Sequence, residues 1–334
     1  MKTSKYNVLK HLNTKIHPGN DFFGYVNSDW KKKNPIPQEY AAWSTFSDLA
    51  QRVREELHVI LNGLNKKKYL GSKEEQKLRD YYRSGIDIKS INRHGIKPLQ
   101  KEIEKIQSIE KKKQLTEHIA YLHAIDIDVF WTTGISIDHK KSAENIIYPY
   151  QGGLGLPNRD YYLKKTKEMI TVRKQYALHI KRLTKLVGLS PKEGKRIASN
   201  VMRIEKKLAE KSMPPAEERK IEKWYKKYTY VELKKMAPAI SWDEYIKAIG
   251  IEKIYMAKVV VAQPDFMKEV SDIIKKQTLQ TIKDYLLWHL LSSSSNYLAE
   301  QIAEERFSFI GNKLSGSKKI LPRWKRVVAE IDSG

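Results

Sequence analysis

Apolar residues recur at helical spacing along most of the chain, and capping residues precede several of these runs. A serine or threonine followed three positions later by an acidic residue, the capping box that opens a helix, occurs at 45–48, 72–75, 190–193, 229–232 and 241–244. The first of these helices is predicted to stop at Asn62-Gly63. The same spacing predicts further helices over 98–106, 111–124, 165–188 and, in three pieces, 264–314.

The pattern changes between residues 126 and 150, where β-branched and aromatic side chains gather. The run Val129–Ile137 predicts a strand, and Ile146–Tyr150 is its expected partner across a polar turn at 138–145. Lys258–Ala262 is a further short extended segment. The predicted fold is therefore mainly α, a multi-helix domain with a small β-hairpin element.

The hairpin leads into the most unusual stretch of the sequence, Gln151-Gly-Gly-Leu-Gly-Leu-Pro-Asn-Arg-Asp-Tyr-Tyr-Leu163. Its three glycines and one proline exclude the interior of a helix or strand, because glycine permits positive φ and proline fixes φ near −65°. Asn158 or Asp160 suits the cap of a following helix. The stretch therefore predicts a rigid, specified turn between a strand and a helix.

This stretch resembles the Gly-Leu-Gly-Leu-Pro-x-Arg-Asp-Tyr-Tyr signature of the neprilysin-like zinc metallopeptidases, the family that includes endothelin-converting enzyme and bacterial oligopeptidases. The residues that carry the signature are Gly153, Gly155, Leu156, Pro157, Arg159, Asp160, Tyr161 and Tyr162. Other segments resemble blocks of the same family in the same order: Asp21–Trp30, Asn34–Pro37, Trp43–Phe46, Ile204–Ala209, Tyr225–Leu233, Ser315-Gly316 and Pro322–Arg326.

The resemblance implies the helical N-terminal domain of such a peptidase over residues 18–334, after an N-terminal tail at 1–17. In the family this helical domain caps a zinc-bearing domain, and the two enclose a chamber that admits only peptides. The implied activity is hydrolysis of oligopeptides by a zinc-activated water. The signature residues are expected to be structural.

The zinc chemistry of the family requires a His-Glu-x-x-His helix, whose histidines at i and i+4 share one face. None of the nine histidines of this chain has another four positions away. His118 and His123 are five apart, about 140° around a helix, so they cannot share a face. The family's downstream Glu-x-x-x-Asp and Asn-Ala-x-Tyr blocks have no match either. We therefore expect no catalytic, cofactor-binding or metal-binding residue in this chain, and zinc only with a catalytic domain.

The chain is thus expected to be the cap portion of a metalloendopeptidase, truncated before its catalytic half and inactive alone. A separate catalytic-half chain is the expected partner, with oligopeptides as substrates once the two combine. The alternative is a non-catalytic helical module that binds peptides or proteins. The composition, 40% hydrophobic with 19 tyrosines and no cysteine, indicates a folded protein and permits a bacterial origin in a reducing compartment.

The N-terminus lacks the apolar run of a signal peptide, and no window approaches 18 apolar residues. A cytoplasmic location is therefore expected. The formal net charge of +24 raises a third hypothesis, nucleic-acid binding. Only 14 of the 63 basic residues are arginine, and the lysines lie in scattered pairs and triplets, so a solvated surface is the preferred interpretation and nucleic acid is not an expected partner.

Several individual residues are expected to have structural roles. Arg159 and Asp160 are expected to form a structural ion pair or cap, and Tyr161 and Tyr162 to be one boundary ring and one buried ring. The tryptophans at 30, 43 and 324 are expected to anchor packing. At 219–220 the family's Arg-Asp is Arg-Lys, which puts a salt bridge there in doubt.

Overall fold

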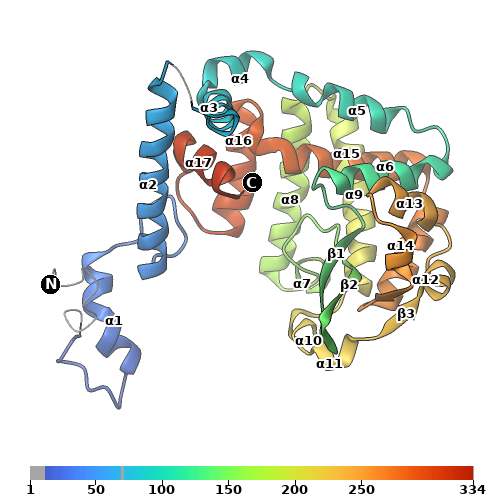
Figure 1. Cartoon of the computed structure of the whole chain (residues 1–334), viewed down its shortest axis with the longest axis horizontal. Coiled ribbons are helices and arrows are strands. Elements are labelled where there is room, and N and C mark those ends of the chain that lie inside the picture. The colour runs from blue at the N-terminus through green and yellow to red at the C-terminus, as the bar shows by residue number, and fades with distance from the viewer. Residues whose placement is uncertain (1–11, 69–70, 334) are drawn as a thin grey trace. The chain divides into compact units, whose positions relative to one another are not determined.

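The computed structural model describes residues 12–68 and 71–333 (Figure 1). These divide into two compact units. The first unit contains residues 12–87 and 310–333, and the second contains residues 88–309. The π-helical segment η6 (Phe307–Leu314) carries the chain from the second unit back to the first.

The first unit is helical. Its helices are α1 (Phe22–Lys33), α2 (Thr45–Lys66), α3 (Lys73–Ile86) and α17 (Arg323–Ser333). Helix α17 packs on both α2 and α3, which brings the two ends of the chain's sequence into one unit (Figure 1). The small core there consists of Leu61, Tyr82, Val327 and Val328, with Trp324 packed against it.

Helix α2 differs from its prediction at both ends. It begins one residue earlier than expected, with Ser44 as the N-cap and a reciprocal capping box to Ser47 in place of Thr45 and Asp48. It also continues past Asn62-Gly63 to Lys66. Leu61 and Leu64 are buried on this last stretch, and their packing outweighs the modest cost of a glycine inside a helix.

The second unit holds the remaining α-helices: α4 (Ile88–His94), α5 (Gln100–Gln107), α6 (Leu115–Ala124), α7 (Asp160–Leu163), α8 (Lys167–Leu186), α9 (Pro191–Lys211), α10 (Pro215–Glu218), α11 (Ile221–Trp224), α12 (Tyr230–Met236), α13 (Trp242–Ala248), α14 (Pro264–Lys276), α15 (Leu279–Ser294) and α16 (Glu300–Arg306). Short 3₁₀ turns are η2 (Lys97–Leu99), η3 (Lys112–Gln114), η4 (Lys253–Met256) and η5 (Ser295–Tyr297). Helix α9 is central, since it packs against α7, α8, α14 and α15.

The capping boxes predicted at 190–193 and 229–232 open α9 and α12 with reciprocal hydrogen bonds. Ser72 likewise caps α3 by accepting from the backbone of Glu75. Ser241 precedes α13 as expected but makes no capping bond with its side chain. Local sequence therefore locates the helix starts well, even where the cap itself is not formed. The mainly-α fold class is confirmed.

A four-stranded sheet of order β1-β2-β4-β3 lies within the second unit. Its strands are β1 (Trp131–Asp138), β2 (Lys141–Gln151), β3 (Lys227–Thr229) and β4 (Lys258–Val260). The predicted hairpin forms as β1 and β2, but its turn is only His139-Lys140, so the long polar turn at 138–145 was wrong. Lys141–Asn145 is exposed strand, held by backbone pairing rather than by burial. β3 was not predicted, because three residues show no alternation.

The tip of the hairpin is fixed by a buried carboxylate. Asp138 accepts a hydrogen bond from Tyr225 and forms an ion pair with Lys227, the first residue of β3. Burial opposes the ionisation of Asp138, but these two donors outweigh it and hold the pKa of the carboxyl below its usual value. The contact helps to explain why β3 lies on the same sheet as the hairpin, although Tyr225 and Asp138 are 87 positions apart in the sequence.

The base of the hairpin is held by a directed chain of hydrogen bonds. Trp131 Nε1 donates to Thr133 Oγ1 at 3.1 Å, and Thr133 Oγ1 lies 2.8 Å from the Tyr245 hydroxyl. His123 Nε2 donates to the Val129 carbonyl oxygen at 2.9 Å, and in the neutral ring Nδ1 accepts from the Tyr245 hydroxyl at 2.7 Å. His123 joins α6, α13 and the start of the hairpin.

Among the described helices, none is both long and apolar enough to cross a membrane. The cytoplasmic location stays a prediction.

The His123 contacts predict a pH-dependent stability. Burial of the ring lowers the pKa of His123 from 6.5 to about 4, against the opposing effect of the Val129 carbonyl. The unfolded chain therefore takes up this proton first as the pH falls. The stabilisation is complete above about pH 6.5, and it is lost as the pH falls from there toward 4, with a total of about 3 kcal/mol.

Urea unfolding of the chain and of His123→Gln, measured between pH 4 and 8, checks this expectation. The variant should be less stable at pH 8 and should lose less stability than the wild type between pH 6.5 and 4. Parallel pH curves for the two proteins would contradict it.

Candidate functional site

The signature loop joins the end of β2 to α7, and two of its glycines are required by close packing. Gly153 has φ +68°, and a Cβ there would lie 2.4 Å from the backbone nitrogen of Phe130. The Tyr285 hydroxyl bridges the same place, since it donates to the Gly153 carbonyl at 2.9 Å and accepts from Phe130 N at 2.8 Å. Only glycine fits this approach of two backbones.

Gly155 leaves room for a buried polar group. A Cβ at this position would lie 1.9 Å from the Tyr176 hydroxyl oxygen and 3.0 Å from Glu205 Oε1. The Gly155 backbone nitrogen instead donates to Glu205 Oε1 at 3.2 Å. The missing side chain therefore lets the loop reach the carboxylate directly.

Glu205 of α9 is the centre of this arrangement. It is fully buried, and besides Gly155 it accepts from the Tyr162 hydroxyl at 2.7 Å, the Tyr176 hydroxyl at 2.9 Å and His289 Nε2 at 3.2 Å. Tyr162 also accepts from the Leu156 backbone nitrogen at 2.8 Å. The donors come from the loop, α7, α8 and α15, so one carboxylate ties together four segments.

Burial, and then the nearby charge of Glu205, raise the pKa of both Tyr162 and Tyr176 well above the usual value. Both rings therefore remain hydroxyl donors. A carboxylate with no exposed surface, whose four donors all belong to this chain, is out of reach of a substrate proton. The geometry argues for anchoring of the loop rather than for acid–base catalysis.

The other signature residues lie around this anchor. Leu156 is buried and Pro157 is exposed. Arg159 donates to the Ala209 carbonyl at 3.2 Å, whereas Asp160 pairs with Lys164 at 2.8 Å, so the two do not use each other as partners. Tyr161 is half-buried beside the fully packed Tyr162.

The start of α7 also differs from expectation. Its N-cap residue is Arg159, and no side chain caps the helix in the predicted manner. Asn158 instead accepts from the Asp160 backbone nitrogen at 2.9 Å, which closes a turn within the loop.

The two histidines of α6 have different hydrogen-bond partners. His118 Nδ1 contacts the Gln114 carbonyl oxygen at 2.9 Å, and both nitrogens of His123 are used in the hairpin network. Across residues 12–68 and 71–333, no three histidine, cysteine, aspartate or glutamate side chains gather as a metal site would require. The described residues do not fit zinc.

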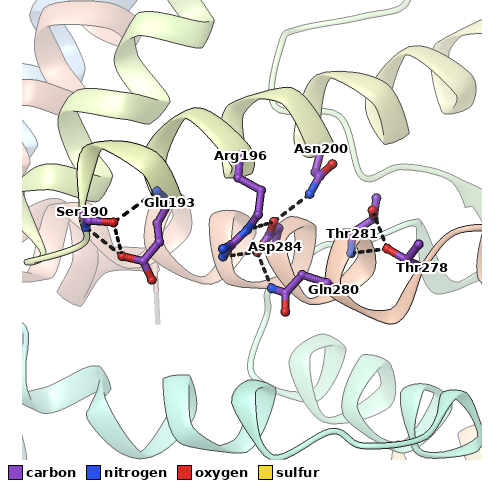
Figure 2. A network of polar contacts seen from close by, with 8 residues as sticks. All are labelled: Ser190, Glu193, Arg196, Asn200, Thr278, Gln280, Thr281 and Asp284. Atoms are coloured by element: carbon purple, nitrogen blue, oxygen red, sulfur yellow. Dashed lines mark hydrogen bonds and ion pairs between the residues drawn. The ribbon is translucent and has the colours of Figure 1, made fainter.

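Sequence reasoning also missed the buried carboxylate of Asp284. Figure 2 shows Arg196 and Asn200 reaching from α9 toward Asp284 on α15. Arg196 donates to both oxygens at 2.9 and 3.1 Å, while Asn200 and Gln280 donate at 2.7 and 2.8 Å. The carboxylate is saturated, so it joins α9 to α15 without a free acceptor.

A cavity of about 60 Å³ adjoins this network, between α5, α9 and α15. Ile106, Arg196 and Lys283 are among its lining residues. This volume holds a few water molecules at most, far below the several hundred Å³ of a ligand site.

The sequence contains a signal for the buried carboxylates of Glu205 and Asp284, because each of them interrupts an apolar helical face.

Comparison with known proteins gives a consistent result. The N-terminal model of Peptidase family M13 matches residues 18–334. Endothelin-converting enzyme 1 of Rattus norvegicus is 31% identical over 339 residues, which cover 98% of this chain and 43% of that protein. Neprilysin-3 of Drosophila melanogaster is 29% identical over 346 residues, 98% of this chain and 44% of that protein.

The crystal structure of the Mycobacterium tuberculosis zinc metalloprotease ZMP1 in complex with an inhibitor has the same fold. It superimposes with a TM-score of 0.90 and 24% sequence identity over 97% of this chain and 49% of that one. The chain thus spans less than half the length of these three relatives.

Glu205 generates a prediction with a matched control on the same helix. Glu205→Gln replaces one acceptor oxygen by a donor that faces Tyr162, Tyr176 and His289, and we expect a loss of about 3 kcal/mol in the free energy of unfolding. Glu210→Gln changes only an exposed pair with Lys206 at 3.8 Å and should alter stability by less than about 0.5 kcal/mol. Urea unfolding of both variants measures these two changes in stability. Equal unfolding midpoints for the two variants would contradict the role of Glu205.

Gly155 gives a second test of the same loop. Gly155→Ala forces a methyl group against Tyr176 and should destabilise the chain by about 3 kcal/mol or more. Gly134→Ala, in an exposed part of β1 with no atom within 4 Å, should be neutral or slightly stabilising. Thermal unfolding compares the two, and a tolerated Gly155→Ala would show that the loop is not held against Glu205.

Proposed function

The chain belongs to peptidase family M13, and from this premise we propose that it forms the N-terminal helical cap of a neprilysin-like zinc metalloendopeptidase that hydrolyses oligopeptides. The observation that carries the proposal is the extent of the match. It covers 97–98% of this chain but only 43–49% of the relatives, which include a protein named as a zinc metalloprotease. The chain corresponds to one part of such an enzyme.

The catalytic chemistry then lies outside these 334 residues. The sequence holds no two histidines four positions apart, and Glu205 and Asp284, its most deeply bonded carboxylates, are saturated by internal donors. We therefore assign no residue of this chain to zinc or to the hydrolytic step. A catalytic half supplies both, either in the same polypeptide or as a separate chain.

The proposed contribution of this chain is to shape the space in which the peptide is held. A rigid cap suits that role, since it limits the size of the substrate without taking part in the reaction. The saturated networks around Glu205 and Asp284 make the second unit rigid, because each joins helices that are distant in sequence.

A complementation experiment tests the proposal. The chain is mixed with the separately expressed remainder of rat endothelin-converting enzyme 1, beyond its matched part, in the presence of zinc. We expect hydrolysis of an internally quenched peptide by the mixture at a rate at least about tenfold above that of either part, because a chamber needs both halves.

The control replaces the glutamate of the His-Glu-x-x-His motif in the added half by glutamine, which should abolish the hydrolysis. Zinc-dependent hydrolysis by the chain alone would contradict the assignment of chemistry to the other half. Peptide binding by the chain with no gain in hydrolysis on mixing would instead favour the non-catalytic binding module.

A further inference from the structure

Helix α2 carries an apolar face that is longer than the surface covering it. Phe46, Leu49, Val53 and Ile60 follow at intervals of three, four and seven residues, so they lie on one side of the helix. Phe46 is 82% exposed and Val53 is 43% exposed. We call these four residues the α2 stripe.

The same side of α2 is covered farther along. Leu57 and Leu61 pack into the small core with Tyr82 of α3 and Val327 of α17, and Leu64 is buried as well. The packing partners α3 and α17 therefore cover the C-terminal half of this face. The α2 stripe is mostly its N-terminal continuation, and within the described first unit its large side chains remain exposed.

We propose that the α2 stripe is the docking face for the zinc-bearing catalytic half, an inference that rests on the proposed function. An amphipathic helix with anchors at i, i+3 and i+7 is a standard way to bind an apolar groove. Polar residues border the stripe, among them Asp48 paired with Arg52 at 3.5 Å. An apolar centre with a charged border is the usual composition of a protein interface.

The position of α17 argues for this occupant. Helix α17 is the last described helix, and it packs directly on α2 and α3. The relatives extend over more than twice the matched length. A polypeptide that continues from the position of α17, as in those relatives, starts from the same unit that carries the α2 stripe. A second copy of this chain has no such connection.

The chain has no cysteine, which permits a clean cross-linking test. Val53→Cys places a single thiol in the α2 stripe, and Val59→Cys places one about 120° away on the same helix, at a valine that is 72% exposed. Each variant is labelled with a benzophenone maleimide, mixed with the remainder of rat endothelin-converting enzyme 1, and irradiated. We expect cross-links to that half from position 53 and at least about fivefold fewer from position 59.

The outcomes separate the two proposals. If the halves associate and hydrolyse the peptide but cross-links form equally from both positions, the docking face is overturned and the proposed function stands. The same holds if position 53 is cross-linked to a second copy or within the 334 residues. The absence of any association or hydrolysis overturns the proposed function, and the docking face with it.

A charge substitution gives an independent measurement. Val53→Asp should weaken the association of the two halves at least tenfold, because a carboxylate would be buried in an apolar contact. Val59→Asp should change it less than twofold. Both side chains are exposed in the first unit, so both variants should keep the thermal midpoint of the wild type. Equal affinities for the two variants would overturn the inference.

Discussion

The second unit depends on one buried charge. Glu205 has no contact with solvent, and its carboxylate is stable there only because hydroxyl, imidazole and backbone donors surround it. Those donors belong to segments from Gly155 to His289, so satisfying one residue of α9 fixes the loop, α7, α8 and α15 together. The glycine at 155 follows from this requirement, since only a loop without a side chain there can approach Glu205 so closely, while Gly153 allows the loop to pass close to the Phe130 backbone.

The sequence was a good guide where local chemistry decides. The caps at Ser190 and Thr229 open helices as predicted, because an N-cap and its acidic partner act within four residues. It was a poor guide where tertiary packing decides. Gly63 did not end α2, since the burial of Leu64 one residue later outweighs the preference of glycine. The three residues of β3 are a strand only because β4 lies beside them.

The polar networks were the largest omission. A glutamate at 205, followed by two lysines, resembles any surface helical residue until the faces of α9 are compared with those of α8 and α15. The signature loop was recognised, but its partner was not, because the contact joins positions 50 residues apart. An acidic residue inside an apolar helical stripe is the signal that was available, and Asp284 within the apolar run of α15 shows the same pattern.

The two units differ in how their polar and apolar side chains are packed. In the second unit, buried carboxylates, tyrosines and histidines bind one another, and its largest apolar rings lie in the interior. The first unit has a small core, and α2 exposes apolar side chains that its own neighbours do not reach. A helix face of that kind is costly in water unless another surface covers it. A partner surface over α2 is therefore expected to stabilise the first unit, whose own core is small.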